Sequence, residues 1–142
     1  MRLAGSSIAI CVTLVALSAC EREPPLAEAS RTARAFMEAF STGDHDAAAR
    51  LATGDVLHGV EVARDTRARE RREHPAEVAL LEKVMRERPP DVELRPPRRH
   101  EDTAEVRAVV TTEGPGGSER SQYELRLVWR EPRWLVYRWE RR

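Results

Sequence analysis

Residues 104–140 alternate between apolar and polar side chains, and this alternation is the feature that most constrains the fold. From Tyr123 to Trp129 every second side chain is apolar, and most of those between are charged. A period of two residues is typical of β-strands that bury one face. Turn signals at residues 114–118 and 131–132 interrupt the pattern, so we expect three antiparallel strands in succession. All three Trp and both Tyr lie here, which makes this region the main source of bulky core side chains.

The residues before these strands carry a helical period instead. Apolar side chains recur every three or four positions over residues 26–40, which predicts an amphipathic helix ended by Gly43. Asp44 is expected to cap a short second helix that runs to residues 50–51. Helices followed by an antiparallel sheet predict an α+β fold, with the helices packed on one face of the sheet.

In the middle of the chain, the sequence pattern predicts the secondary structure less clearly. Residues 64–73 are almost wholly charged with mixed signs, which is typical of a solvated helix held by ion pairs or of a loose segment. Pro75 marks the start of another amphipathic helix. Its expected apolar stripe is Val78, Leu81, Val84 and Met85. We expect a short strand at residues 92–94 and a polar turn at residues 98–102 before the sheet.

The first 20 residues predict where the domain works. A positive start precedes an apolar run over residues 8–17, which has the length of a signal-peptide core and is too short to span a bilayer. Residues 17–20 (Leu-Ser-Ala-Cys) resemble the lipobox of bacterial lipoproteins. The resemblance implies cleavage before Cys20 and lipidation of that cysteine; an ordinary secretory signal with an incidental cysteine is the alternative. The expected division is a signal peptide at 1–19, the lipidated Cys and its tether at 20–27, and one domain at 28–142.

A lipoprotein of this kind is expected in the bacterial cell envelope, anchored to a membrane through acylated Cys20 and facing the periplasm or the exterior. The choice between inner and outer membrane stays open. The other cysteine, Cys11, falls in the expected signal peptide, so the mature domain keeps no free thiol for disulfides, catalysis or metal binding. Lys plus Arg and Asp plus Glu number 24 each, so we expect no nucleic-acid partner.

A family resemblance sharpens the expected fold. The helical phrase at residues 35–48, together with a late Trp-apolar-apolar-Tyr strand at residues 134–137, resembles the NTF2-like (cystatin-like α+β) superfamily. The resemblance implies a strongly bent sheet that wraps a conical pocket behind a long first helix. That group contains isomerases, dehydratases and transport factors, so it implies no particular chemistry. The Tyr and Asp pair of its ketosteroid isomerase-like members has no matching positions here.

Aromatic side chains form the first candidate site, a pocket for an apolar ligand on the concave face of the sheet. Its expected lining is Phe36, Phe40, Trp129, Trp134 and Tyr137. The alternative is that the same side chains are simply the core, because they follow strand and helix periodicity.

A histidine among carboxylates forms the second candidate site. On a helix, His58 would share a face with Glu61 and Asp65, and Asp55 lies close by in the sequence. A buried His58–Glu61 pair would suit a general base. The alternative is the start of a solvated helix with acidic residues in its first turn. No familiar metal-ligand motif is present, and we expect no metal and no cofactor.

Together these features predict a membrane-anchored lipoprotein with a non-enzymatic role, binding a small apolar ligand or an envelope protein. One alternative is an enzyme with an acid/base residue in the sheet cavity. Another is a structural envelope protein that interacts through its Arg-rich segment at 64–73. By analogy with other sheets of this kind, a homodimer is compatible with each of these roles.

Overall fold

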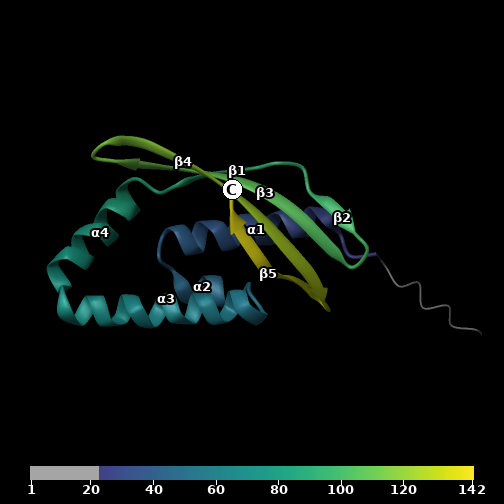
Figure 1. Cartoon of the computed structure of the whole chain (residues 1–142), viewed down its shortest axis with the longest axis horizontal. Helices are drawn as coiled ribbons and strands as arrows, with labels where there is room; N and C mark the ends of the chain where they lie inside the picture. Colours follow the sequence, from purple (N-terminus) through teal and green to yellow (C-terminus); the bar gives the residue numbers. More distant parts are fainter. Residues whose placement is uncertain (1–22) are drawn as a thin grey trace, which may run out of the picture.

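The computed structural model describes residues 23–142, in which four helices precede a five-stranded antiparallel sheet (Figure 1). The helices are α1 (Leu26–Ser41), α2 (His45–Ala49), α3 (Gly54–Glu73) and α4 (Pro75–Glu87). The strands are β1 (Asp91–Leu94), β2 (Arg98–His100), β3 (Thr103–Gly114), β4 (Gly117–Arg130) and β5 (Arg133–Arg141). The domain is therefore α+β, as the two kinds of periodicity predicted.

Long antiparallel pairing of β3 with β4 forms the centre of the sheet, whose order is β1-β3-β4-β5. β2 pairs with the same edge of β3 as β1 does. Pro96 and Pro97 separate these two short strands, because proline has no N–H to continue a ladder. The predicted polar turn at 98–102 is wrong in its first half: residues 98–100 form β2, since edge pairing uses the backbone and tolerates charged side chains.

A register shift interrupts the pairing of β4 with β5. Arg126 pairs with Arg138, whereas Leu127 pairs with Val136, so Tyr137 is an extra residue on β5. A bulge of this kind changes which later side chains point to the core. Val136 and Trp139 both pack in the core cluster, and Tyr137 is not part of it.

Helix α1 lies across the concave face of the sheet (Figure 1). Its buried stripe begins with Ala29 and Ala33, whose small side chains let the helix approach the strands closely, and continues with Phe36. The helix ends as predicted at Gly43, whose φ of +79° favours glycine. The side chain of Asp44 then caps α2 by accepting a hydrogen bond from the N–H of Ala47 (3.0 Å).

The charged segment proves to be the solvated helix of the two alternatives. It forms the second half of α3 and carries the ion pairs Arg67–Glu70 (3.2 Å) and Arg71–Glu82 (2.5 Å), the second of which joins α3 to α4. Only Val56 and Val60 of this helix are buried. Pairs this exposed stabilise a fold by roughly 0–1 kcal/mol each.

Helix α4 begins at Pro75 as predicted, but its apolar stripe does not face the core. Val78 is its one buried residue, whereas Leu81 and Val84 are 39% and 40% exposed. α4 lies away from α1 and the core, below the end of the β3–β4 hairpin, and packs mainly on α3, so the expected stripe has little to pack against (Figure 1). No helix within residues 23–142 is long and apolar enough to cross a membrane. The predicted signal peptide and Cys20 lie outside the described residues.

Candidate functional site

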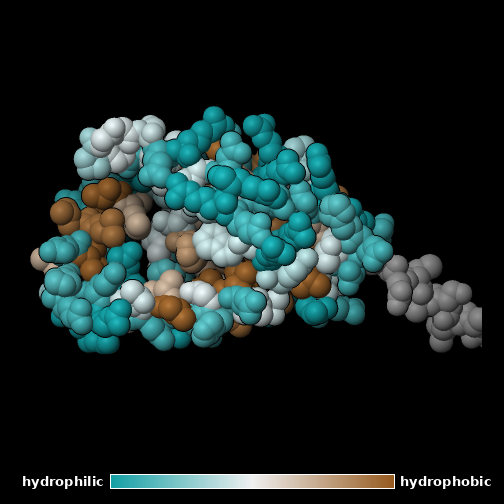
Figure 2. Space-filling view, viewed as in Figure 1, coloured by the Kyte–Doolittle hydropathy of each residue, from teal (hydrophilic) through white to brown (hydrophobic). Residues whose placement is uncertain are grey.

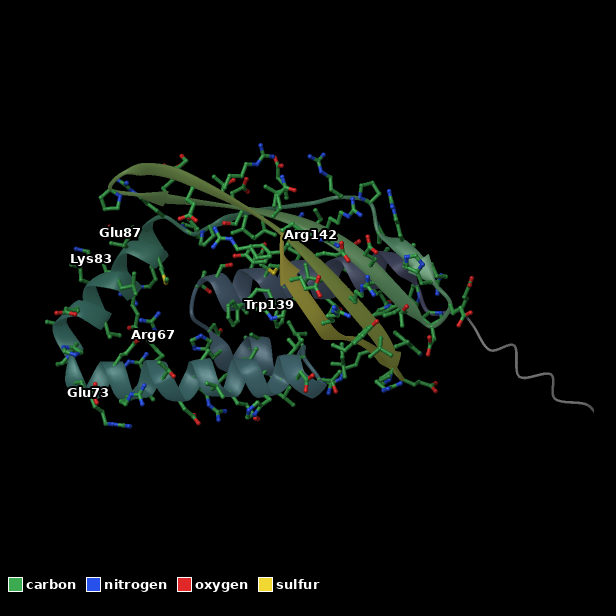
Figure 3. The ribbon with its side chains drawn as sticks, in the orientation of Figure 1. Arg67, Glu73, Lys83, Glu87, Trp139 and Arg142 are labelled. Carbon is green, nitrogen blue, oxygen red and sulfur yellow. The ribbon has the colours of Figure 1, made fainter. Side chains whose placement is uncertain are left out.

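Aromatic side chains fill the concave face of the sheet at the end nearest α2. The rings of Phe40 and Trp139 meet edge to face at 4.7 Å, and Tyr123 stacks on the other side of Trp139 at 5.5 Å. Phe36 lies behind them, 5.8 Å from Trp139, and is fully buried. Figure 3 shows Trp139 beneath the sheet, over α1. These rings contact one another as core side chains do.

The predicted aromatic pocket is divided between the two ends of the sheet. Trp129 and Trp134 pack against each other at 5.5 Å, and the indole N–H of Trp134 donates to the carbonyl of Pro25 (3.0 Å). These contacts hold the start of α1 rather than line the same space as Phe40. Tyr137 joins none of the aromatic contacts recorded for residues 23–142, because the bulge displaces it.

His58 and Glu61 lie on α3, away from the face that buries Val56 and Val60. His58 is exposed, and no hydrogen bond or ion pair within residues 23–142 joins it to Glu61. The residues described contain no cluster of three or more metal-ligating side chains. The geometry of this pair is that of solvated helix residues.

A different histidine lies at the mouth of the concave face. His45, at the start of α2, packs edge to face on Phe40 with 5.8 Å between ring centroids. Burial lowers the pKa of His45, and the positive charge of Arg67 lowers it further. Arg67 extends from α3 toward the space between α3 and α4 and is only 23% exposed (Figure 3). The sequence carries little signal for this contact, because Phe40 and His45 lie on different helices and meet only through the turn between α1 and α2.

The exposed side of α4 is the clearest apolar feature on the surface of the described domain. Leu80 is 64% exposed, and Leu81 and Val84 lie beside it on the same helix. Figure 2 shows an apolar (brown) patch at the end of the domain where α4 lies. We call Leu80, Leu81 and Val84 the α4 surface. On the inner side of α4, a hollow of about 370 Å³ separates the helix from the turn at residues 42–44. α4 therefore packs against α3 along one side and is exposed to solvent along the other.

Comparison with known proteins identifies the fold. No family model matches the chain, and no curated protein matches it significantly. A variant of the protein Rd1NTF2_05 has 13% identity and a TM-score of 0.52, covering 80% of this chain and 96% of that chain. An NTF2-like protein of unknown function from Shewanella oneidensis has 10% identity and a TM-score of 0.52, covering 78% and 92%. A SEC-C motif-containing protein from Rhodopseudomonas palustris has 14% identity and a TM-score of 0.50, covering 81% and 79%.

At these identities the likeness shows the fold alone. The domain has an NTF2-like α+β fold, as the phrase at residues 35–48 predicted.

The lowered pKa of His45 gives a testable pH dependence. The folded state disfavours the imidazolium, so below the usual value of 6.5 the unfolded chain takes up the proton more readily. We expect the free energy of unfolding of the native chain to fall relative to that of His45→Gln as the pH drops through this range. Urea denaturation of both proteins at about pH 7.5 and about pH 5 measures the difference. A difference that stays constant, or that changes in the opposite direction, would contradict the assignment.

Proposed function

We propose that the protein is a lipid-anchored lipoprotein of the bacterial envelope whose NTF2-like domain binds a protein partner, without catalysis, through the α4 surface. The proposal takes its anchor from the lipobox-like residues 17–20 and its tether from the residues that follow. It takes its binding site from one observation: three large apolar side chains stand exposed together on a helix that has little other packing.

The filled concave face favours this role over a pocket for a small apolar ligand. Phe36 and Trp134 have exposures of 0% and 1%, and the half-buried Phe40 and Tyr123 contact Trp139. A ligand there would have to displace core side chains, which costs several kcal/mol for each large one removed from the core. The exposure of His58 likewise gives an acid/base mechanism little support.

A partner that buried the α4 surface would gain binding free energy from the hydrophobic effect. Leu80 alone leaves 64% of its surface in water, and complete burial of one such side chain contributes about 1.5–3 kcal/mol. Charged residues border the patch, among them Lys83 and Glu87, which pair at 3.8 Å. An apolar centre with a charged rim is the usual anatomy of a protein interface.

The position of α4 favours a protein over the membrane of the anchor. α1 begins at Leu26, next to the tether, and its 16 residues run about 24 Å across the sheet toward the end where α4 lies (Figure 1). The α4 surface is thus at the end of the domain far from the tether. The neighbouring charges are mixed in sign, as in the Arg71–Glu82 pair, so the patch lacks the positive field that draws helices to anionic lipid.

The anchor is tested by exchanging each cysteine in turn. Cys20→Ser should move the protein from the membrane fraction to the soluble fraction and abolish incorporation of a labelled fatty acid, because acyl chains supply the anchoring energy. Cys11→Ser is the matched control and should change neither the amount of protein in the membrane fraction nor the incorporation of the labelled fatty acid. A Cys20→Ser protein that still carries label in the membrane fraction would show that Cys20 is not the lipidated residue.

The α4 surface is tested by a photoreactive phenylalanine analogue placed at Leu80 of the full chain in living cells. We expect one protein adduct of defined mass, because the patch should be covered by its partner. The same analogue at Arg130, an exposed residue at the end of β4, is the control and should give no such adduct.

Three results would overturn the proposal. An adduct with the mass of two chains would make the surface a homodimer interface. An adduct with lipid alone would make it a membrane contact. No adduct at Leu80 above that at Arg130 would leave the α4 surface without a partner.

A further inference from the structure

The face of the sheet opposite the helices carries a second hollow, of about 650 Å³, which the proposed function does not use. Its charged lining is Arg95, Arg98, Glu105, Arg107 and Arg142. Arg107 pairs across the ladder with Glu124, and both alternate with the core residues Val106 and Leu125. These side chains therefore point away from the helices. We call this hollow the arginine pocket.

Backbone pairing fixes the wall of the arginine pocket. The N–H of Arg95 donates to the carbonyl of Arg107 (2.8 Å), and Arg98 pairs with Glu105 at the start of β2. Between them, Pro96 and Pro97 have a restricted φ, which limits the motion of this short link. The guanidinium groups of Arg95 and Arg98 are thus carried by a short, well-fixed segment rather than by a long loop.

The base of the pocket holds a buried carboxylate that is already neutralised. Glu124 is only 5% exposed and accepts hydrogen bonds from Arg126 and Arg142. Burial raises the pKa of Glu124, but the hydrogen bonds and charges of Arg142 and Arg126 outweigh this effect and lower it, so the group stays ionised. Arg107 lies 3.4 Å from Glu105 and 4.0 Å from Glu124.

In the described part of the chain, some of the guanidinium groups that line the arginine pocket are not paired with a carboxylate. The four guanidinium groups that line the pocket face two carboxylates, Glu105 in the lining and Glu124 beneath it. Within residues 23–142, Arg95 and Arg98 have no carboxylate at ion-pair distance. These two guanidinium groups therefore border, without a paired carboxylate among the described residues, a hollow of about 650 Å³, which is within the size range of small-ligand sites, about 300–1,000 Å³.

We propose that the arginine pocket binds a phosphate monoester group, with Arg95 and Arg98 as its main ligands and Arg107 at its base. A phosphate monoester carries close to two negative charges near neutral pH and offers three acceptor oxygens in different directions. Arg95 and Arg98 come from the segment that links β1 to β2, and Arg107 comes from β3, so donors from two separate elements line the pocket. A single carboxylate has one plane and one charge, and would leave part of the field unbalanced.

The phosphate has two sources with the same chemistry, a free phosphate compound or a lipid headgroup. Arg99, next to the pocket wall, donates to the carbonyl of Pro24 and pairs with Glu23, so the pocket wall lies close to the tether. The headgroup as a source rests on the proposed anchor at Cys20, whereas binding of a free phosphate compound does not, and the experiment distinguishes the two sources.

The test is calorimetric titration of the full chain in non-ionic detergent with inorganic phosphate at about pH 7.5, where the phosphate is largely dianionic. We expect saturable binding that weakens as the pH is lowered from this value, because inorganic phosphate gains a proton and loses one negative charge. Arg95→Gln/Arg98→Gln should weaken binding about tenfold or more, because two charge-assisted hydrogen-bond donors are lost. The matched control is Arg69→Gln/Arg72→Gln, which removes the same charge from the exposed face of α3 and should change the affinity less than about twofold.

The same titration is repeated with micelles that contain phosphatidic acid, whose headgroup is a phosphate monoester. Micelles that contain phosphatidylcholine, a phosphate diester, are the control for the lipid itself. Saturation at lower concentration with phosphatidic acid than with inorganic phosphate identifies the headgroup as the ligand, and equal affinity identifies free phosphate. The proposal is overturned if neither probe binds saturably. It is also overturned if the two double variants lose affinity equally, because that result would reflect overall charge and not this pocket.

Discussion

The packing of α1 on the concave face of β3, β4 and β5 is the interaction on which the rest of the structure depends. Ala29, Ala33 and Phe36 have no exposed surface, and this stripe brings the helix against the central strands. The other helices are placed relative to that layer: α2 follows α1 through the turn at Gly43, and the N–H of Thr53 donates to Val136 on β5 (2.9 Å) to hold the start of α3. α4 comes last and packs mainly on α3.

This packing also decides where binding can occur. Rings that would line an open cone in this fold contact one another instead, as Phe40 and Trp139 do. The core therefore occupies the concave face, and the two features that we propose for recognition lie elsewhere on the domain. One is the apolar α4 surface, and the other is the arginine pocket on the opposite face of the sheet.

Local signals in the sequence were enough to predict much of the fold. The strand alternation and the Asp44 cap are properties of neighbouring residues, and both were confirmed. The environment of the candidate site residues depends on long-range geometry, which local patterns in the sequence do not reveal. The bulge that removes Tyr137 from the core exists only in the pairing of β4 with β5, and the exposure of Leu81 follows from the packing of α4 mainly on α3 and away from the core. A helical stripe shows which side chains share a face, but not whether another element covers it.

The central claim is that a protein partner covers the α4 surface. Amide hydrogen exchange over residues 75–87 tests it most directly, measured on the full chain in its native membranes and again after purification away from other proteins. A helix that packs mainly on one neighbour opens easily, so these amides should exchange faster than those of α1 in the purified chain and slow markedly in the membranes. Equal exchange of α4 in both preparations, with α1 as the internal reference, would contradict the account.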